Sequence, residues 1–150
     1  MAAPTWDDTA MGVLKEYEKR VHCKWFKIAV VFYRGDEFLT AGYNGPSRGE
    51  PHCDEVGCLK EVNGIRLPAG SGLCRGAHAE MNALANAAEN NKDLHGARLY
   101  CSFSPCYTCA KTLANLSITD YVYRERYPDE DNRGIELLLR RGIFVRQFVW

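Results

Sequence analysis

Two short segments on either side of residues 81–104 constrain the fold of this chain more than any other feature. The first, His78-Ala79-Glu80, opens a run of residues with helical spacing, and the second, Pro105-Cys106-Tyr107-Thr108-Cys109, opens another. Cys106 and Cys109 are three positions apart and therefore face the same side of a helical turn. One histidine and two cysteines form a common zinc ligand set. A shared ion would require the starts of two helices, separated by one predicted strand, to lie side by side.

The ligand set predicts a catalytic metal rather than a structural one. Three protein ligands leave one corner of a tetrahedral zinc open for water. Two thiolates and a neutral histidine balance the charge of the ion, which still lowers the pKa of a bound water toward neutrality. Glu80 lies two positions beyond the histidine and is therefore turned aside from the ion, where it can carry protons. We predict His78, Cys106 and Cys109 as ligands of a catalytic Zn²⁺ and Glu80 as the proton shuttle.

The length and charge of the chain limit the classes of protein that need to be considered. A chain of 150 residues, with 46% hydrophobic and 25% charged residues, is typical of one globular domain, 1–150. Its 19 basic and 19 acidic residues cancel, which disfavours nucleic acid or an anionic membrane as a partner. No apolar run approaches the roughly 20 residues of a membrane span, and residues 1–8 lack the pattern of a secretory signal. We therefore expect a cytoplasmic protein.

Hydrophobic spacing predicts alternating helices and strands. This pattern predicts an α/β fold, a three-layer αβα domain in which a five-stranded mixed sheet has helices on both faces. In the second helix, the spacing of Met81, Leu84, Ala85 and Ala88 predicts the buried face. Helices are expected at 6–20, 77–90, 106–116 and around 135–139, and strands at 27–33, 37–42, 97–103, 120–124 and 143–148.

The segment 42–76 is rich in glycine, proline and cysteine and has no sustained periodicity. Seven cysteines, an odd number, favour metal binding or catalysis over a disulfide framework in such a chain. We expect this segment to be a loop insertion ordered by a second, structural zinc, because metal binding can replace a missing apolar core. Its predicted ligands are Cys23, Cys53, Cys58 and Cys74, with His52 as an alternative to Cys23. The competing interpretation is that these cysteines are small unpaired hydrophobic residues.

Beyond the metal motif, several segments resemble the cytidine and deoxycytidylate deaminase superfamily over about residues 20–148. The pairing of H-x-E with P-C-x-x-C is a signature of zinc deaminases. Ser104 precedes Pro105 where tRNA adenosine deaminases and guanine deaminases usually have glutamate, which favours the deoxycytidylate branch. Other similar segments are GYNGPSRG at 42–49, PHCDE at 51–55, Cys74-Arg75, YVYRERY at 121–127 and GIELL at 134–138.

The resemblance implies a cytidine-deaminase-like fold and an activity. The expected reaction is the zinc-dependent hydrolysis of dCMP to dUMP with release of ammonia, which supplies dUMP for thymidylate synthesis. It also implies a homo-oligomer, such as a hexamer, and allosteric control by dCTP and dTTP.

The resemblance further indicates which residues bind the substrate. Asn44 is expected to hydrogen-bond the sugar, and Tyr127 to line the nucleotide pocket. The backbone N–H of Ala79 and the backbone C=O of Ser104 are expected to face the base edge. A 5′-phosphate also needs a basic partner. The candidates are Arg48, Arg124 and Arg126.

Three alternatives remain open at this point. A deaminase acting on a base in tRNA or single-stranded DNA would need a basic, open groove, which the balanced charge disfavours. A deaminase of free nucleosides would need no partner for a phosphate. A non-enzymatic zinc-binding module would have no use for Glu80 beside the metal ligand.

Overall fold

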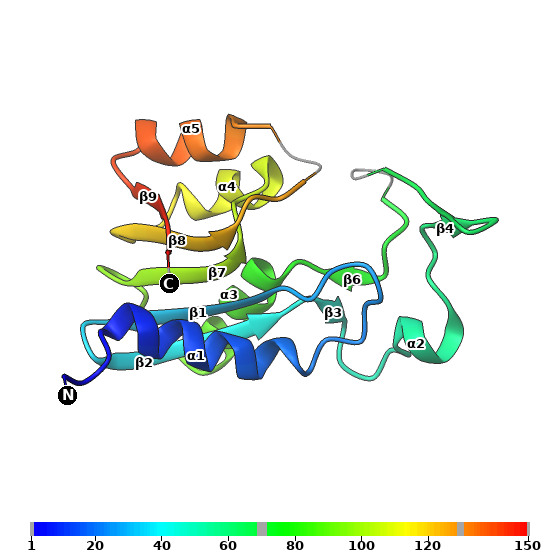
Figure 1. Cartoon of the computed structure of the whole chain (residues 1–150), viewed down its shortest axis with the longest axis horizontal. Helices are drawn as coiled ribbons and strands as arrows, with labels where there is room; N and C mark the ends of the chain where they lie inside the picture. The colour runs from blue at the N-terminus through cyan, green and yellow to red at the C-terminus, as the bar shows by residue number, and fades with distance from the viewer. Residues whose placement is uncertain (1, 69–71, 129–130, 150) are drawn as a thin grey trace.

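The centre of the molecule is a five-stranded sheet in the order β2-β1-β7-β8-β9. The computed structural model describes residues 2–68, 72–128 and 131–149. β1 (Ala29–Arg34) pairs antiparallel with β2 (Glu37–Tyr43) and with β7 (Arg98–Phe103), whereas β8 (Asp120–Glu125) is parallel to β7 and to β9 (Phe144–Gln147). The sheet is therefore mixed, as predicted (Figure 1).

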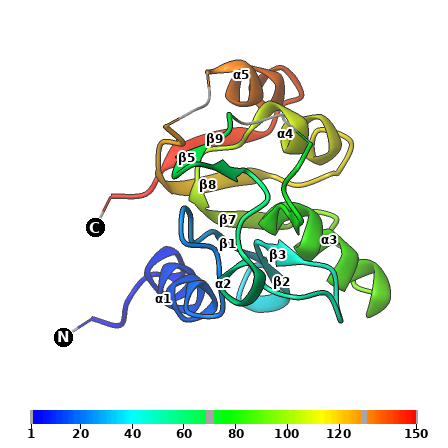
Figure 2. The ribbon, with the colours of Figure 1, turned by 90° about the vertical axis from the view of Figure 1, so that its right-hand side faces the viewer.

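Helices cover both faces of this sheet, which confirms the three-layer prediction. α1 (Trp6–Glu18) lies on one face, and α3 (Ala79–Glu89), α4 (Tyr107–Leu113) and α5 (Arg133–Arg140) lie on the other (Figure 2). The alternation of side chains along the strands separates the two cores: in β1, Val31 packs toward α1, and Val30 packs toward α3 and α4.

Helix α1 is fixed at its start and along its buried side. Thr5 and Asp8 form a reciprocal capping box that satisfies backbone groups at the helix start. Asp7 then ties the helix to the sheet, because its carboxylate accepts a 2.7 Å hydrogen bond from the hydroxyl of Tyr100 and a 2.6 Å hydrogen bond from Arg146. The helix therefore links the central strand β7 to the last strand, β9.

The buried face of α3 differs from the predicted one. Ala85 and Ala88 are exposed, and Met81 and Leu84 are only partly buried, so the prediction for this face was wrong. The predicted face follows the spacing of apolar residues and includes Ala85 and Ala88, but the helix turns a different set of mainly small residues toward the sheet. The buried positions are Ala79, Glu80, Ala83 and Ala87.

The reason for this orientation is the close approach of α3 to β2 at Gly42. A Cβ atom added to Gly42 would lie 2.3 Å from the backbone nitrogen of Ala83 and 2.6 Å from the carbonyl oxygen of Ala79. The hydroxyl of Thr40 also donates a 3.0 Å hydrogen bond to the carbonyl of Ala83. Larger helix residues cannot face the sheet at this separation, so Met81 and Leu84 are turned to the side.

The segment between β2 and α3 contains several short elements instead of a continuous loop. β3 (Gly45–Pro46) pairs with β6 (Gly76–Ala77), α2 (Cys53–Val56) forms one turn of helix, and β4 (Glu61–Val62) and β5 (Ile65–Arg66) form a hairpin. This part extends from one end of the sheet, on the right of Figure 1. Elements of two to four residues are too short to leave a periodic signal in the sequence.

Within the described residues, no helix has the length and apolar character needed to cross a bilayer. The cytoplasmic location stays a prediction.

The contact at Gly42 yields a prediction for stability. Gly42→Ala should lower the free energy of unfolding by about 2 kcal/mol or more, because the added methyl group meets backbone atoms that cannot move aside easily. Gly12→Ala is the matched control: Gly12 is exposed in α1 with open space around it, so the same change should be neutral or stabilising by up to about 1 kcal/mol. Urea unfolding of both variants measures the difference, and equal effects would contradict the close packing.

Candidate active site

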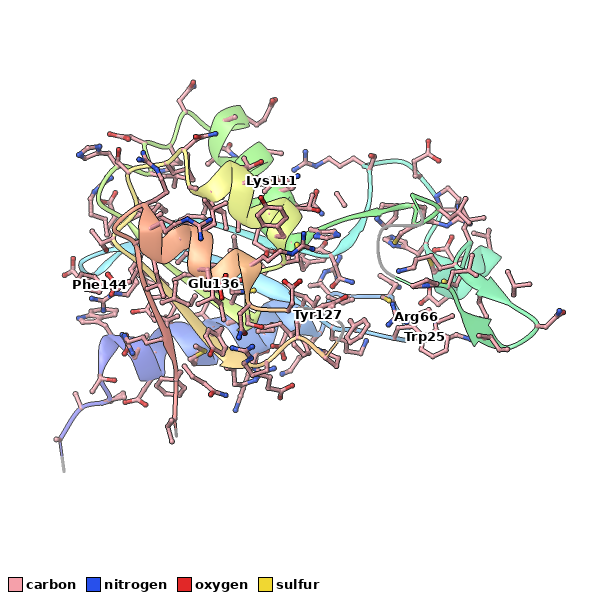
Figure 3. All side chains as sticks on the ribbon, turned by 90° about the horizontal axis from the view of Figure 1, so that it is seen from above. Trp25, Arg66, Lys111, Tyr127, Glu136 and Phe144 are labelled. Carbon is pink, nitrogen blue, oxygen red and sulfur yellow. The ribbon has the colours of Figure 1, made fainter. Side chains whose placement is uncertain are left out.

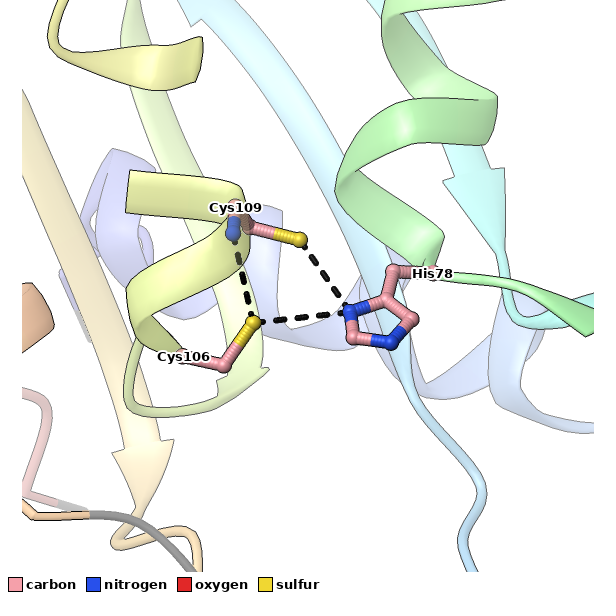
Figure 4. Close-up of side chains that lie close together, drawn as sticks. All are labelled: His78, Cys106 and Cys109. Carbon is pink, nitrogen blue, oxygen red and sulfur yellow. Dashed lines mark hydrogen bonds between the residues drawn. The ribbon is translucent and has the colours of Figure 1, made fainter. Parts of the chain in front are cut away.

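Three predicted ligands meet where the helices α3 and α4 begin. His78 is the N-cap residue of α3 and Cys106 the N-cap residue of α4, both with extended backbone, and Cys109 lies in the first turn of α4. Their side chains face one another across the space between the two helix starts (Figure 4). The two segments on either side of residues 81–104 are therefore brought together as the sequence required.

The distances between these side chains fit a tetrahedral zinc. The Nδ1 atom of His78 is 3.2 Å from the Sγ atom of Cys109 and 3.5 Å from the Sγ atom of Cys106. Zinc bonds of about 2.0–2.3 Å would place such ligand atoms about 3.5–3.8 Å apart, so only small shifts are needed. Among residues 2–68, 72–128 and 131–149, this is the only group of three or more His, Cys, Asp or Glu side chains whose ligand atoms lie within 4.8 Å of one another.

The two cysteines are also prepared chemically to bind a cation. A hydrogen bond from the Cys109 thiol lowers the pKa of the Cys106 thiol to about 4, against the opposing effect of burial, and His78 and the backbone N–H of Cys109 lower it further. The same thiol–thiolate hydrogen bond and burial raise the pKa of Cys109. One thiolate is therefore present at neutral pH, and thiolates are the form of cysteine that binds metals.

Glu80 lies beside this group and is almost completely buried, with 5% of its surface exposed. Burial raises the pKa of its carboxyl group, and the nearby Cys106 thiolate raises it further, although the backbone and His78 partly oppose the shift. The hydroxyl of Tyr121 lies 3.5 Å from Oε2 of Glu80 and donates a 2.9 Å hydrogen bond to the carbonyl of Phe103. A carboxyl group whose pKa is shifted toward neutrality is suited to general acid–base catalysis.

A cavity of about 400 Å³ opens onto these groups, which is within the usual range for small-ligand sites. Its wall includes His78, Glu80 and Cys106. Another part of the wall is an aromatic cluster, in which the rings of Phe26 and Tyr127 stack with centroids 5.1 Å apart. Phe103 meets both rings edge-on at 5.8 and 5.7 Å. The cavity thus combines acid–base and metal-binding groups with flat apolar surfaces.

The structure places three of the predicted substrate-binding residues, Asn44, Ser104 and Tyr127, on the wall of this cavity. The Asn44 side chain accepts a 2.9 Å hydrogen bond from the N–H of Ile28 and donates a 3.2 Å hydrogen bond to the carbonyl of Phe26. The Ser104 hydroxyl accepts a 2.8 Å hydrogen bond from the N–H of Tyr127. Asn44 and Ser104 therefore hold parts of the cavity wall in place.

Other predicted substrate-binding residues do not line the cavity. Ala79 is buried at the start of α3. Arg48 donates a 2.6 Å hydrogen bond to the side chain of Asn86. The other two arginine candidates for the phosphate also have partners elsewhere: Arg124 is paired with Glu18 at 2.8 Å, and Arg126 donates to Asn132.

Two cations on the cavity wall, Lys60 and Arg66, were missed by the sequence reasoning. Lys60 directly precedes β4, and Arg66 is the last residue of β5. The Asn63-Gly64 turn of this hairpin is a recognisable hairpin signal between Val62 and Ile65. That signal could have located the hairpin but not the cavity that it faces.

The four cysteines predicted to bind a structural zinc, Cys23, Cys53, Cys58 and Cys74, also lie on the cavity wall. Burial raises the pKa of Cys53, as do the nearby Cys58 and Cys74, while a hydrogen bond with Arg75 opposes the shift. The alternative ligand His52 stacks on His22 at 3.9 Å between ring centroids. No three of these side chains lie within 4.8 Å of one another in the described part of the chain, and the second zinc stays a prediction.

Comparison with known proteins identifies the class to which this fold and site belong. Residues 4–125 match the model of the cytidine and deoxycytidylate deaminase zinc-binding region. The chain therefore belongs to the cytidine and deoxycytidylate deaminase family, whose matched region is zinc-binding.

Individual relatives are similar along most of the chain. It is 32% identical over 146 residues to the deoxycytidylate deaminase of Schizosaccharomyces pombe, with 97% of this chain but only 45% of the relative covered. It is 30% identical over 128 residues to the deoxycytidylate deaminase of Mycobacterium phage D29, with 82% of this chain and 97% of the relative covered. The chain thus spans less than half the length of the fission yeast relative.

A solved structure shows the same architecture. The dCMP deaminase from the cyanophage S-TIM5, in complex with dCMP and dUMP, superposes with a TM-score of 0.80 at 26% sequence identity. The match covers 99% of this chain and 100% of the phage chain.

The geometry of the three ligands predicts the effect of removing one of them. Cys109→Ser should lower zinc content at this position by at least tenfold, because the hydroxyl group replaces a thiolate. Cys101→Ala is the control, since Cys101 is a buried cysteine of β7 that does not belong to the ligand group. Elemental analysis after gel filtration measures the metal, and equal zinc in both variants would show that Cys109 is not a ligand.

Proposed function

We propose that this chain catalyses the zinc-dependent hydrolytic deamination of dCMP to dUMP and ammonia, and so supplies dUMP for thymidylate synthesis. The observation that carries the proposal is the placement of the buried Glu80 beside the group of His78, Cys106 and Cys109, with Glu80, His78 and Cys106 on the wall of one cavity. Support comes from relatives named deoxycytidylate deaminase and from the similar phage enzyme that binds dCMP and dUMP.

In this proposal, His78 Nδ1 and the thiolates of Cys106 and Cys109 hold one zinc ion, and their spacing is the main support for it. Zinc bound there would supply the positive charge that lowers the pKa of the attacking water. The chain contributes the position of the ligands, because both N-cap residues belong to helices packed against the same face of the sheet.

Glu80 transfers the protons of the reaction. Its carboxylate accepts a proton from water as the water oxygen bonds to the ring carbon that bears the amine, and it delivers this proton to the adjacent ring nitrogen. A second proton passes from the added hydroxyl group through Glu80 to the amine, the carbon–nitrogen bond breaks, and ammonia leaves. Burial of Glu80 keeps bulk water from competing for these protons.

Asn44, Ser104 and Tyr127 form part of the proposed nucleotide site. The stacked rings of Phe26 and Tyr127 give a flat apolar wall for the nucleoside, and Asn44 supports the sugar side of the cavity. The backbone C=O of Ser104 faces the base edge in this proposal, whereas the same role for the backbone N–H of Ala79, which is not on the cavity wall, stays a prediction. The role of Arg48 in substrate binding stays a prediction, because Arg48 contacts Asn86 and is not on the cavity wall.

A structural zinc forms the second part of the proposal. We place it among Cys23, Cys53, Cys58 and Cys74, with His52 as the alternative to Cys23. All four cysteines lie on one cavity wall in a segment of very short elements, where a metal would supply the order that burial does not. Assembly into a homo-oligomer such as a hexamer, and control by dCTP and dTTP, stay predictions.

Glu80→Gln tests the mechanism. The amide fills the same space but cannot shuttle protons, so turnover of dCMP should fall by at least 10²–10⁴-fold while the zinc content stays unchanged. Glu89→Gln, an exposed change in the same helix, should leave the rate within about twofold of the wild type. Ammonia release at the wild-type rate from zinc-loaded Glu80→Gln would refute the proposed role.

The choice of substrate can be tested with a panel of cytosine compounds. The value of kcat/KM for dCMP should exceed that for deoxycytidine by at least 10–100-fold, because a phosphate forms charge-assisted hydrogen bonds that deoxycytidine lacks. Ammonia release from both, and from single-stranded DNA and tRNA, measures this preference. Equal efficiency on dCMP and deoxycytidine would indicate a nucleoside deaminase, and activity only on a polynucleotide would indicate a nucleic-acid deaminase.

Metal analysis tests the structural zinc. Protein prepared without chelator should contain about two zinc ions per chain, and Cys58→Ser should remove one of them and lower the melting temperature. The ion at His78, Cys106 and Cys109 should remain. One zinc per chain in the wild type, together with a Cys58→Ser variant as stable as the wild type, would rule out the second site.

A further inference from the structure

β2 is an outer strand of the sheet, and its free edge presents backbone carbonyls to α3. In the described part of the chain, β2 pairs with β1 only. The N–H of Asn44, which follows β2, donates a 3.1 Å hydrogen bond to the carbonyl of Ile28. Backbone groups of an antiparallel strand point alternately toward the partner strand and away from it. The carbonyls of Ala41 and Tyr43 therefore face the free edge, where an outer strand leaves such groups without a partner strand.

Two asparagines of α3 bind these two carbonyls. The side-chain amide of Asn82 donates a 2.9 Å hydrogen bond to the carbonyl of Tyr43, and that of Asn86 donates a 2.8 Å hydrogen bond to the carbonyl of Ala41. Four residues span about 6 Å along a helix, and two residues span about 6.7 Å along a strand, so the two spacings match. The helix thus takes the place of a further strand along this part of the edge and runs in the direction opposite to β2.

Further contacts hold the helix at one position along the strand. Arg48 donates a 2.6 Å hydrogen bond to the amide oxygen of Asn86, so the amide nitrogen of Asn86 faces the strand. The hydroxyl of Thr40 donates a 3.0 Å hydrogen bond to the carbonyl of Ala83, and Gly42 leaves no room for a Cβ atom beside the helix backbone. A helix held at two points one turn apart cannot slide along the strand without breaking hydrogen bonds.

The start of the same helix carries groups of the active site. The N–H of Asn82 donates a 3.0 Å hydrogen bond to the carbonyl of His78, and Glu80 lies between these two residues in the sequence. His78 and Glu80 are on the wall of the cavity, as are Trp25 and Tyr127 (Figure 3). The two asparagines are not on this wall. They can therefore act on the reaction through the position of the helix and not through contact with a ligand.

We infer that Asn82 and Asn86 are positioning residues for proton transfer. Their hydrogen bonds to the free edge of β2 fix α3 along the strand and thereby set the place of Glu80 relative to the bound base. A misplacement of reacting groups by about 1 Å can lower a rate about 100-fold, so hydrogen bonds outside the cavity can affect catalysis. The inference rests on the proposed function, because the role of the asparagines is defined through Glu80.

The first test is the removal of each hydrogen bond, with Asn82→Ala and Asn86→Ala. The value of kcat for dCMP should fall about tenfold in Asn82→Ala, which is nearer to Glu80, and less in Asn86→Ala. The value of KM should stay within about twofold, because neither residue is on the cavity wall. Zinc-saturated protein is assayed well below the melting temperature of each variant, so that unfolding does not contribute to the loss.

Two controls separate position from stability. Asn90→Ala removes an exposed amide that follows α3 and donates a 2.8 Å hydrogen bond to the carbonyl of Asn86, within the same segment. Ser102→Ala removes a buried hydroxyl on the α1 side of the sheet, which accepts a hydrogen bond from the N–H of Ala29 and donates one to Glu18. Ser102→Ala should lower the melting temperature, but both controls should keep kcat within about twofold of the wild type.

A combination with Glu80→Gln shows whether the effect passes through Glu80. The proton shuttle is already lost in this background, so adding Asn82→Ala should lower the residual kcat by less than about twofold. The melting temperature should fall by the same amount in both backgrounds, because the same hydrogen bond is lost. Ammonia release at high enzyme concentration measures the residual rate.

Several results would overturn the inference while leaving the proposed function intact. One is a wild-type kcat in both asparagine variants, and another is an equal loss of kcat with and without Glu80→Gln. A loss of kcat in Ser102→Ala as large as that in Asn82→Ala would also do so. If one asparagine variant does not fold, the other carries the test, and failure of both to fold would make the contact structural only. A wild type that releases no ammonia from dCMP would instead overturn the proposed function, and the inference with it.

Discussion

One metal ion can contact His78, Cys106 and Cys109 together only if the starts of α3 and α4 keep their relative position to within a few tenths of an ångström. Much of the packing maintains this position. Close backbone approaches on both sides fix the helices. Gly42 allows α3 to lie against β2, and an added Cβ on Gly134 would lie 2.6 Å from the carbonyl of Pro105, just before α4. Small residues far from the site in sequence therefore determine the distances between its ligands.

Burial shifts the pKa values of the ionisable groups in the site, and it also lowers the stability of the fold. Glu80 and the Cys106 thiolate lie together where little water can stabilise negative charge, and burial and then the thiolate raise the pKa of the Glu80 carboxyl group. Such an arrangement weakens a fold unless a cation or a hydrogen-bonding partner compensates. Its presence beside a cavity is therefore better explained by catalysis than by stability.

Part of the cavity wall comes from the segment between β2 and α3, which has almost no core of its own. The hairpin β4–β5, the turn of helix α2 and the pair β3–β6 are each held by a few local contacts, such as the Lys24–Glu61 ion pair. This design separates two tasks. The sheet and its helices position His78, Glu80, Cys106 and Cys109, and the insertion brings the cations Lys60 and Arg66 to the wall of the same cavity.

The sequence by itself determined the order of helices and strands, the three-layer architecture and the group of His78, Cys106, Cys109 and Glu80, because hydrophobic periodicity and ligand spacing are local properties of the chain. Only the tertiary structure decided which face of α3 is buried, since that depends on the contact between Gly42 and a helix about 40 residues away. It also decided that Arg66 lines the cavity and Arg48 does not, because a side chain in a short irregular segment takes its position from the distant surfaces against which it packs.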